Sequence, residues 1–162
     1  MVEGPGVRLN AEKLRRSVLN KIVVSVCGGA LDASVVGQLP GHCLGSILPL
    51  GKELFLFFLA AQNLDDSSDP SEICLRLHFG MSGSALVDSV HRFRKQPALE
   101  ILFDSGNALR LYETTVETRS PTSTRSKVER LQNLDVCSQA RRPMVPFVSS
   151  SRIRAHIQWE IR

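Results

Sequence analysis

The chain has 162 residues, the length of one ordinary domain, and 43% of them are apolar, which is enough for one modest core. This composition excludes a disordered chain, and with 22% charged residues, one Trp and one Tyr it also excludes a coiled coil. No apolar run reaches the roughly 18 residues that span a bilayer, and residues 1–6 lack the basic start of a secretory signal. These features predict a soluble intracellular protein with no membrane segment.

The net charge of +4 is unevenly distributed along the chain. Residues 1–124 carry 12 Lys and Arg against 13 Asp and Glu, whereas residues 125–162 carry 8 against 3. A basic segment of this kind either raises the affinity for nucleic acid through counterion release or is a solvated loop, and composition leaves both interpretations open.

The cysteines are dispersed and lack any Cys-x-x-Cys pair. This spacing is typical of neither a zinc ribbon nor a dense disulfide framework. We therefore expect reduced thiols at all four positions: Cys27, Cys43, Cys74 and Cys137.

A helix is predicted over residues 9–19. Leu14 and Val18 lie at helical spacing, and Asn10 is a residue type that caps a helix N-terminus. Leu9 and Leu14 have the spacing of a hydrophobic staple around that cap. A second helix is predicted over 124–134, although little of the predicted structure is available for it to pack against.

Strands are predicted wherever apolar residues alternate or β-branched residues cluster between turn signals. The clearest of them presents Leu54, Leu56 and Phe58 on one face and Phe55, Phe57 and Leu59 on the other, which predicts burial on both faces. The six segments are 21–27, 46–59, 73–79, 84–87, 98–103 and 108–112.

One leading helix followed by six short strands predicts an α+β fold that is mostly β. We expect a two-layer β-sandwich with an N-terminal helix. Residues beyond about 138 are expected to be poorly ordered, because they contain a Ser run and only one segment with a strand pattern.

Several residues suggest chemistry, and each also has an ordinary structural explanation. Glu3 beside a terminus is usually a solvated charge, and Lys52 at the rim of a strand is usually a solubilising edge residue. His78 on a strand is more often a hydrogen-bonded sheet residue than a base or ligand. Met81, in a Gly-rich turn, is commonly a gap filler.

Three motifs that contain these residues are more informative together. They are Met1-Val-Glu-Gly-Pro-Gly6, Leu50-Gly-Lys-Glu-Leu-Phe-Leu-Phe-Phe58 and Leu75-Arg-Leu-His-Phe-Gly-Met-Ser-Gly-Ser84. In this order and approximate spacing they resemble the N-terminal domain of the formamidopyrimidine-DNA glycosylase and endonuclease VIII family. Within it the chain is most similar to a vertebrate branch, and the resemblance extends to about residue 138.

The resemblance implies a DNA glycosylase that excises oxidised bases and cleaves the strand at the abasic sugar. Removal of Met1 would expose the Val2 amine as the nucleophile that forms a Schiff base, and Glu3 would act as the general acid. An α-amino group titrates at about 7.7 to 8.0 against about 10.4 for lysine, so a chain terminus supplies neutral amine near pH 7. Most of the family has proline where this chain has Val2.

The resemblance also implies a DNA-binding surface. Lys52 corresponds to a lysine that contacts the lesion phosphate, and Met81 to an apolar wedge that fills the gap left by the flipped lesion. His78 and Arg119 are assigned to the same surface. The family usually has an Arg-Arg-Phe-Gly stretch where this chain has Val116-Glu-Thr-Arg119, which implies a weak grip on the opposite strand and a preference for single-stranded DNA.

The domain prediction that follows is a catalytic β-sandwich over residues 1–120, the start of a helical DNA-binding domain over 121–138, and a divergent basic tail over 139–162. The family's helix-two-turns-helix and zinc-finger motifs do not occur in this sequence, so no cofactor or metal is expected. Damaged DNA is the predicted partner, the nucleus the predicted location and a monomer the predicted state. The alternative is a truncated, non-enzymatic remnant that binds DNA weakly, and a third hypothesis is an unrelated β-sandwich interaction domain.

Overall fold

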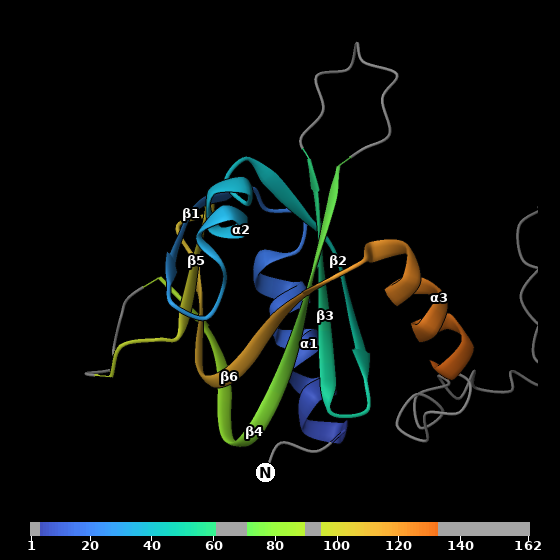
Figure 1. Ribbon diagram of the computed structural model, residues 1–162. Helices are drawn as coiled ribbons and strands as arrows, with labels where there is room; N and C mark the ends of the chain where they lie inside the picture. The colour runs from blue at the N-terminus through green and yellow to red at the C-terminus, as the bar shows by residue number, and fades with distance from the viewer. Residues whose placement is uncertain (1–3, 61–70, 90–94, 133–162) are drawn as a thin grey trace, which may run out of the picture.

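The computed structural model describes residues 4–60, 71–89 and 95–132. Within them six strands form one antiparallel sheet in the order β1-β5-β6-β4-β3-β2 (Figure 1). The elements in chain order are α1 (Gly4–Val18), β1 (Val23–Gly28), α2 (Ala33–Gln38), β2 (His42–Leu50), β3 (Glu53–Ala60), β4 (Glu72–Asp88), β5 (Leu99–Phe103), β6 (Ala108–Arg119) and α3 (Pro121–Gln132).

Strands β4 and β6 join the two halves of the sheet. The first part of β4 pairs with β3, while the first part of β6 pairs with β5, and β4 and β6 pair with each other along both parts. The main core combines α1 with strands from both halves. The prediction of a mostly β, α+β fold with a leading helix is confirmed. The two layers of the predicted β-sandwich belong to one sheet, which is continuous through β4 and β6.

Helix α1 begins earlier than the sequence pattern predicts. Pro5 is accommodated because the first turn of a helix needs no backbone N–H donor there. Asn10 therefore lies inside the helix and Leu9 is 51% exposed, so the predicted cap and staple are wrong. The apolar stripe that faces the sheet extends one turn further toward the N-terminus and consists of Val7, Ala11, Leu14 and Val18.

Strand β3 is buried on both faces, as predicted. Its even-numbered residues Leu54, Leu56 and Phe58 join the main core, whereas Phe55 and Phe57 form a second cluster on the opposite face. The single strand predicted over 46–59 is wrong, because a turn at Gly51 (φ +55°) divides it into β2 and β3. Glycine adopts this left-handed conformation without the steric cost of a side chain.

Helix α3 covers the second cluster. Val128 is 1% exposed and packs with Phe55, Phe57 and the buried Cys74. The Arg125 guanidinium carbon lies 4.2 Å from the centre of the Phe57 ring, a cation–π contact. The expectation that this helix has little to pack against is therefore wrong, because the outward-facing phenylalanines of β3 supply its partner.

Burial in this cluster also changes the acidity of Cys74. It raises the pKa of the thiol from 9.0 to about 11, which keeps the sulfur protonated and unreactive at neutral pH. The described cysteines Cys27, Cys43 and Cys74 are free thiols, as predicted.

Two strand predictions need correction, and one helix was not predicted. The segments 73–79 and 84–87 belong to one strand, β4, and the last predicted strand continues to Arg119. The short helix α2 had no counterpart in the sequence analysis.

Within the described ranges no helix is both long and apolar enough to cross a membrane. The expectation of disorder beyond residue 138 lies outside the described residues.

The packing of α3 generates a stability prediction. Val128→Ala should lower the free energy of unfolding by about 1–2 kcal/mol, because it removes two buried methyl groups and leaves a cavity against Phe55 and Phe57. Urea denaturation followed by circular dichroism measures the change. The matched control is Val24→Ala on β1, where the side chain is 54% exposed and the expected change is within about 0.5 kcal/mol. Equal effects of the two substitutions would contradict the packing of α3 on the sheet.

Candidate functional site

Three of the predicted site residues lie at one end of the sheet. Lys52 is exposed in the turn between β2 and β3, and the next residue, Glu53, pairs with His78 of β4. Met81 follows His78 by three residues, where β4 bends. Figure 1 shows the β2–β3 turn, the bend of β4 and the first turn of α1 at the same end of the molecule.

Met81 is presented by an irregularity in the β4–β6 pairing. Phe79 pairs with Thr114 and Ser84 with Tyr112, so residues 80–83 of β4 face the single residue Glu113. The extra residues bulge outward, which leaves the Met81 side chain 77% exposed. An apolar side chain of this size, held in solvent by the backbone on both sides, has the properties required of a wedge between bases.

Glu113 fixes the base of this bulge. Its φ of +48° places it in the left-handed region, which is unusual for a residue other than glycine. Its carboxylate forms an ion pair with Lys95, and hydrogen bonds from Lys95 and Ser82 lower its pKa. The carboxylate thereby links the β5–β6 side of the sheet to the loop that carries Met81.

His78 lies on the outer face of the sheet, opposite the main core. Its Nδ1 atom is buried and has no hydrogen-bond partner among the described residues. The prediction of a hydrogen-bonded sheet histidine therefore does not hold for the Nδ1 atom.

Arg119 is on the same outer face but at a distance from the other three residues. It pairs with Cys74, whereas His78 pairs with Thr115, so four residues of strand, about 13 Å, separate the two. Its guanidinium binds the Glu117 carboxylate. The structure brings Lys52, His78 and Met81 to one end of the sheet and leaves Arg119 apart from them.

Val2 and Glu3 lie outside the described residues. The described chain starts with the first turn of α1, at Gly4, immediately after Glu3. No described group of His, Cys, Asp or Glu side chains is arranged to bind a metal ion.

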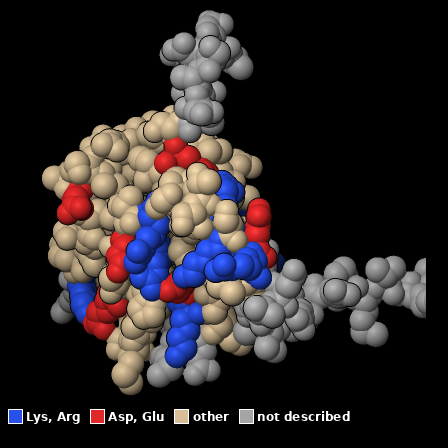
Figure 2. Space-filling view, turned by 45° about the vertical axis from the view of Figure 1, so that its right-hand side comes forward, with Lys and Arg blue, Asp and Glu red and all other residues tan. Residues whose placement is uncertain are grey.

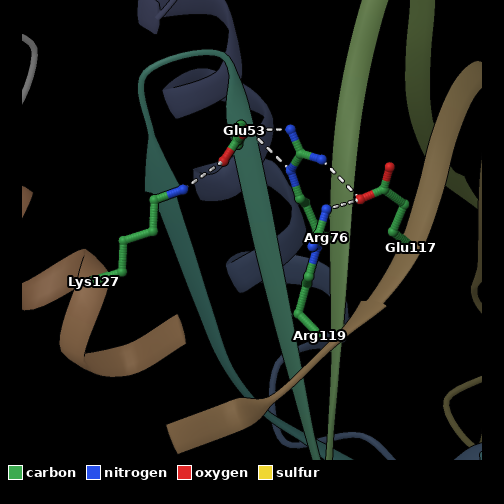
Figure 3. A network of polar contacts seen from close by, with 5 residues as sticks. All are labelled: Glu53, Arg76, Glu117, Arg119 and Lys127. Carbon is green, nitrogen blue, oxygen red and sulfur yellow. Dashed lines mark hydrogen bonds and ion pairs between the residues drawn. The ribbon is translucent and has the colours of Figure 1, made fainter. Parts of the chain in front are cut away.

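The structure adds a charged network that the sequence analysis did not identify (Figure 3). Arg76, at the centre of the outer face, donates to Glu53 of β3 from Nε at 2.9 Å and to Glu117 of β6 from Nη1 at 2.8 Å. Lys127 of α3 lies 3.8 Å from the same Glu53 carboxylate. The hydrogen bond to Glu53 is the main cause of the raised pKa of Arg76, and Arg76 in turn lowers the pKa of Glu117.

One signal for this network was present in the sequence. Cys74, Arg76 and His78 alternate with apolar residues and therefore share a face, but the partners of Arg76 come from two other strands. On the face shown in Figure 2, lysine and arginine side chains alternate with acidic ones instead of forming a continuous positive patch. Much of the positive charge there is balanced by neighbouring carboxylates.

Comparison with solved structures identifies the class of fold. A viral DNA glycosylase superposes with a TM-score of 0.67 at 20% identity, covering 82% of this chain and 50% of that one. MutM, in a complex with DNA that contains carbocyclic 8-oxo-G, gives a TM-score of 0.62 at 17% identity, covering 80% and 49%. The chain therefore has the fold of the N-terminal half of these glycosylases, and the predicted β-sandwich class is confirmed.

Sequence comparison indicates which proteins of this class the chain resembles. Endonuclease 8-like 3 of Mus musculus is 28% identical over 191 aligned positions, covering 98% of this chain and 28% of that protein. Endonuclease 8-like 3 of Homo sapiens is 28% identical over 170 positions, covering 85% and 26%. No protein-family model matches the chain. The resemblance to the formamidopyrimidine-DNA glycosylase and endonuclease VIII family, and within it to endonuclease 8-like 3, is confirmed.

The extent of these alignments has two consequences. The chain spans little more than a quarter of the curated relatives' length, so it matches only part of those proteins. The mouse alignment covers 98% of the chain and thus continues past residue 138, where the sequence motifs end.

The bulge at Met81 can be tested by two glycine substitutions. A Cβ at Gly83 would lie 2.9 Å from the Glu113 carbonyl oxygen and 3.1 Å from the Phe79 Cα, both backbone atoms that cannot move independently. Gly83→Ala should therefore lower the free energy of unfolding by about 1–3 kcal/mol. The matched control, Gly80→Ala, meets only the Glu113 oxygen at 3.8 Å and should change it by less than about 1 kcal/mol. Thermal or urea denaturation compares the two, and a larger loss for Gly80→Ala would contradict this bulge geometry.

Proposed function

We propose that this protein is a DNA glycosylase of base-excision repair with an associated abasic-site lyase activity. The observation that supports the proposal most directly is that the β2–β3 turn, which carries Lys52, the bend of β4, which carries Met81, and the start of α1 lie at one end of a glycosylase-type fold. The similarity to endonuclease 8-like 3 adds independent support from sequence.

The proposed chemistry begins with the Val2 amine. After removal of Met1, its neutral nitrogen bonds to the anomeric carbon of the damaged nucleotide while the glycosidic bond breaks. The base leaves with the bonding electron pair and takes up the proton that the amine loses. Glu3 donates a proton to the ring oxygen, so the sugar opens and the covalent intermediate becomes an imine. Loss of a proton from the adjacent sugar carbon then expels the 3′ phosphate, which is the lyase step.

Lys52 and Met81 act on the DNA in this proposal. The Lys52 ammonium, exposed at the β2–β3 turn, grips the phosphate beside the lesion and keeps the sugar near the amine. Met81 enters the space that the flipped nucleotide leaves, which offsets part of the lost stacking. His78 pairs with Glu53, the residue after Lys52, and is assigned to the same DNA-contacting end of the sheet.

Single-stranded or open DNA is the proposed preference. Arg119, which stands in the segment where the family has an Arg-Arg-Phe-Gly stretch, is engaged with Glu117 and lies about 13 Å along the strand from His78. It is thus poorly placed to support Met81 against an opposite strand. We further propose that the protein acts as a monomer in the nucleus, where its DNA substrate lies.

Trapping with borohydride tests this function. The purified, Met1-processed chain incubated with a single-stranded oligonucleotide that contains an abasic site should give a covalent adduct on a denaturing gel. Glu3→Gln should reduce adduct formation at least about a hundredfold and Lys52→Ala at least about tenfold, because they remove the proton donor and the phosphate contact. The matched lysine control is Lys13→Ala, an exposed position on α1, which should retain the wild-type yield.

The nucleophile is identified by two further measurements. Enzymatic acetylation of the N-terminal amine should abolish the adduct while leaving every lysine unchanged, and peptide mapping of the trapped product should place the modification on Val2. If the wild type binds abasic DNA in a salt-dependent manner but forms no adduct at high protein concentration, the chain is the weakly binding remnant. If it also shows no salt-dependent binding, the unrelated interaction domain is the better explanation.

A further inference from the structure

The residue after Lys52 carries the opposite charge, and the structure controls where that charge lies. Glu53 is the first residue of β3, directly after the turn, and its side chain is only 19% exposed. It lies on the outer face together with its pairing partner His78. A carboxylate one residue from a phosphate-binding lysine opposes binding unless it is neutralised and held away from the phosphate.

Arg76 makes the contacts that this requires. Its Nε and Nη2 atoms both donate to Glu53 Oε1, and its Nη1 atom donates to Glu117 (Figure 3). The guanidinium side chain is 21% exposed, so these charge-assisted bonds are partly shielded from water. Because Arg76 lies on β4, between β3 and β6, it fixes the orientation of Glu53 from the centre of the sheet.

Two further cations bind the carboxylates that Arg76 holds, Lys127 at Glu53 and Arg119 at Glu117. Lys127 of α3 approaches the carboxylate from the side opposite Arg76, with a separation of 3.8 Å (Figure 3). Arg119 also binds Glu117, so loss of Arg76 would leave Glu117 with a direct ion pair, whereas the other ion pair that Glu53 forms in the described part of the chain is the longer one to Lys127, at 3.8 Å. Glu53 is therefore the carboxylate that depends most on Arg76.

We infer that Arg76 is a positioning residue that ties the Glu53 carboxylate to the outer face of the sheet and thereby keeps it away from the DNA phosphate at Lys52. The inference rests on the proposed function of Lys52. It assigns a role to a side chain that is neither at the turn nor in contact with DNA in the proposed complex.

The test is a rescue experiment on the full chain, using fluorescence anisotropy with a single-stranded oligonucleotide that contains a tetrahydrofuran abasic-site analogue. Arg76→Met should weaken binding by about three- to tenfold at low salt, because Glu53 is released beside the phosphate. The double variant Arg76→Met with Glu53→Gln should return to within about twofold of the wild type, since no carboxylate remains to repel the phosphate. Arg76→Lys retains the positive charge and should lose less affinity than Arg76→Met.

The matched control is Arg125→Met. Arg125 forms a similar ion pair with Glu72, which pairs with Leu59 at the end of β3 opposite the turn, and its loss should leave affinity within about twofold of the wild type. Thermal melts of each variant verify that binding is compared between folded proteins. If Arg76→Met binds as tightly as the wild type, or if the double variant remains as weak as Arg76→Met, the positioning role is overturned.

The outcomes separate this inference from the proposed function. If Lys52→Ala binds the analogue as well as the wild type does, the phosphate contact itself is wrong and the positioning role falls with it. If Lys52→Ala weakens binding but Arg76→Met does not, only the positioning role is overturned.

Discussion

The interrupted pairing of β4 with β6 is the feature on which the rest of the structure depends. Two long strands that stay paired on both sides of residues 80–83 allow one sheet to supply both halves of the fold. The same interruption pushes Met81 into solvent and requires Glu113 to adopt a left-handed conformation. Glycine at position 83 is needed because the neighbouring backbone leaves no room for a side chain. The continuous pairing on either side keeps the backbone of Glu113 in this strained conformation.

The two faces of β3 have separate roles. The inner face, with Leu54, Leu56 and Phe58, packs with α1 and holds that helix at a fixed position relative to the β2–β3 turn. The outer face packs with α3 through Phe55 and Phe57. Because the strand is anchored on both sides, the turn that carries Lys52 is supported by a rigid element, which the proposed phosphate contact requires.

Among the residues that the structure describes, charge on the outer face is organised by pairing and does not form a broad positive patch. Arg76 bridges acidic residues from the two neighbouring strands, and Arg125 pairs with Glu72 near α3. Partly exposed pairs of this kind add little to stability individually. Their larger effect is on where each charge lies. In the proposed glycosylase, the pair with a functional consequence is Arg76–Glu53, which holds the carboxylate on the outer face of the sheet.

The sequence by itself determined the mostly β class, the leading helix, the two-faced burial of β3 and the three motifs that resemble a glycosylase domain, because alternation, periodicity and short motifs are local properties. The sequence did not correctly predict where α1 begins, that a turn at Gly51 separates β2 from β3, or that α3 packs against the sheet. It also missed the partners of Arg76, which belong to strands that are distant in the chain. Only the tertiary structure decided that Lys52, His78 and Met81 share one end while Arg119 does not, since strand register and the bulge at Gly80–Gly83 set those distances and neither can be read from residue order.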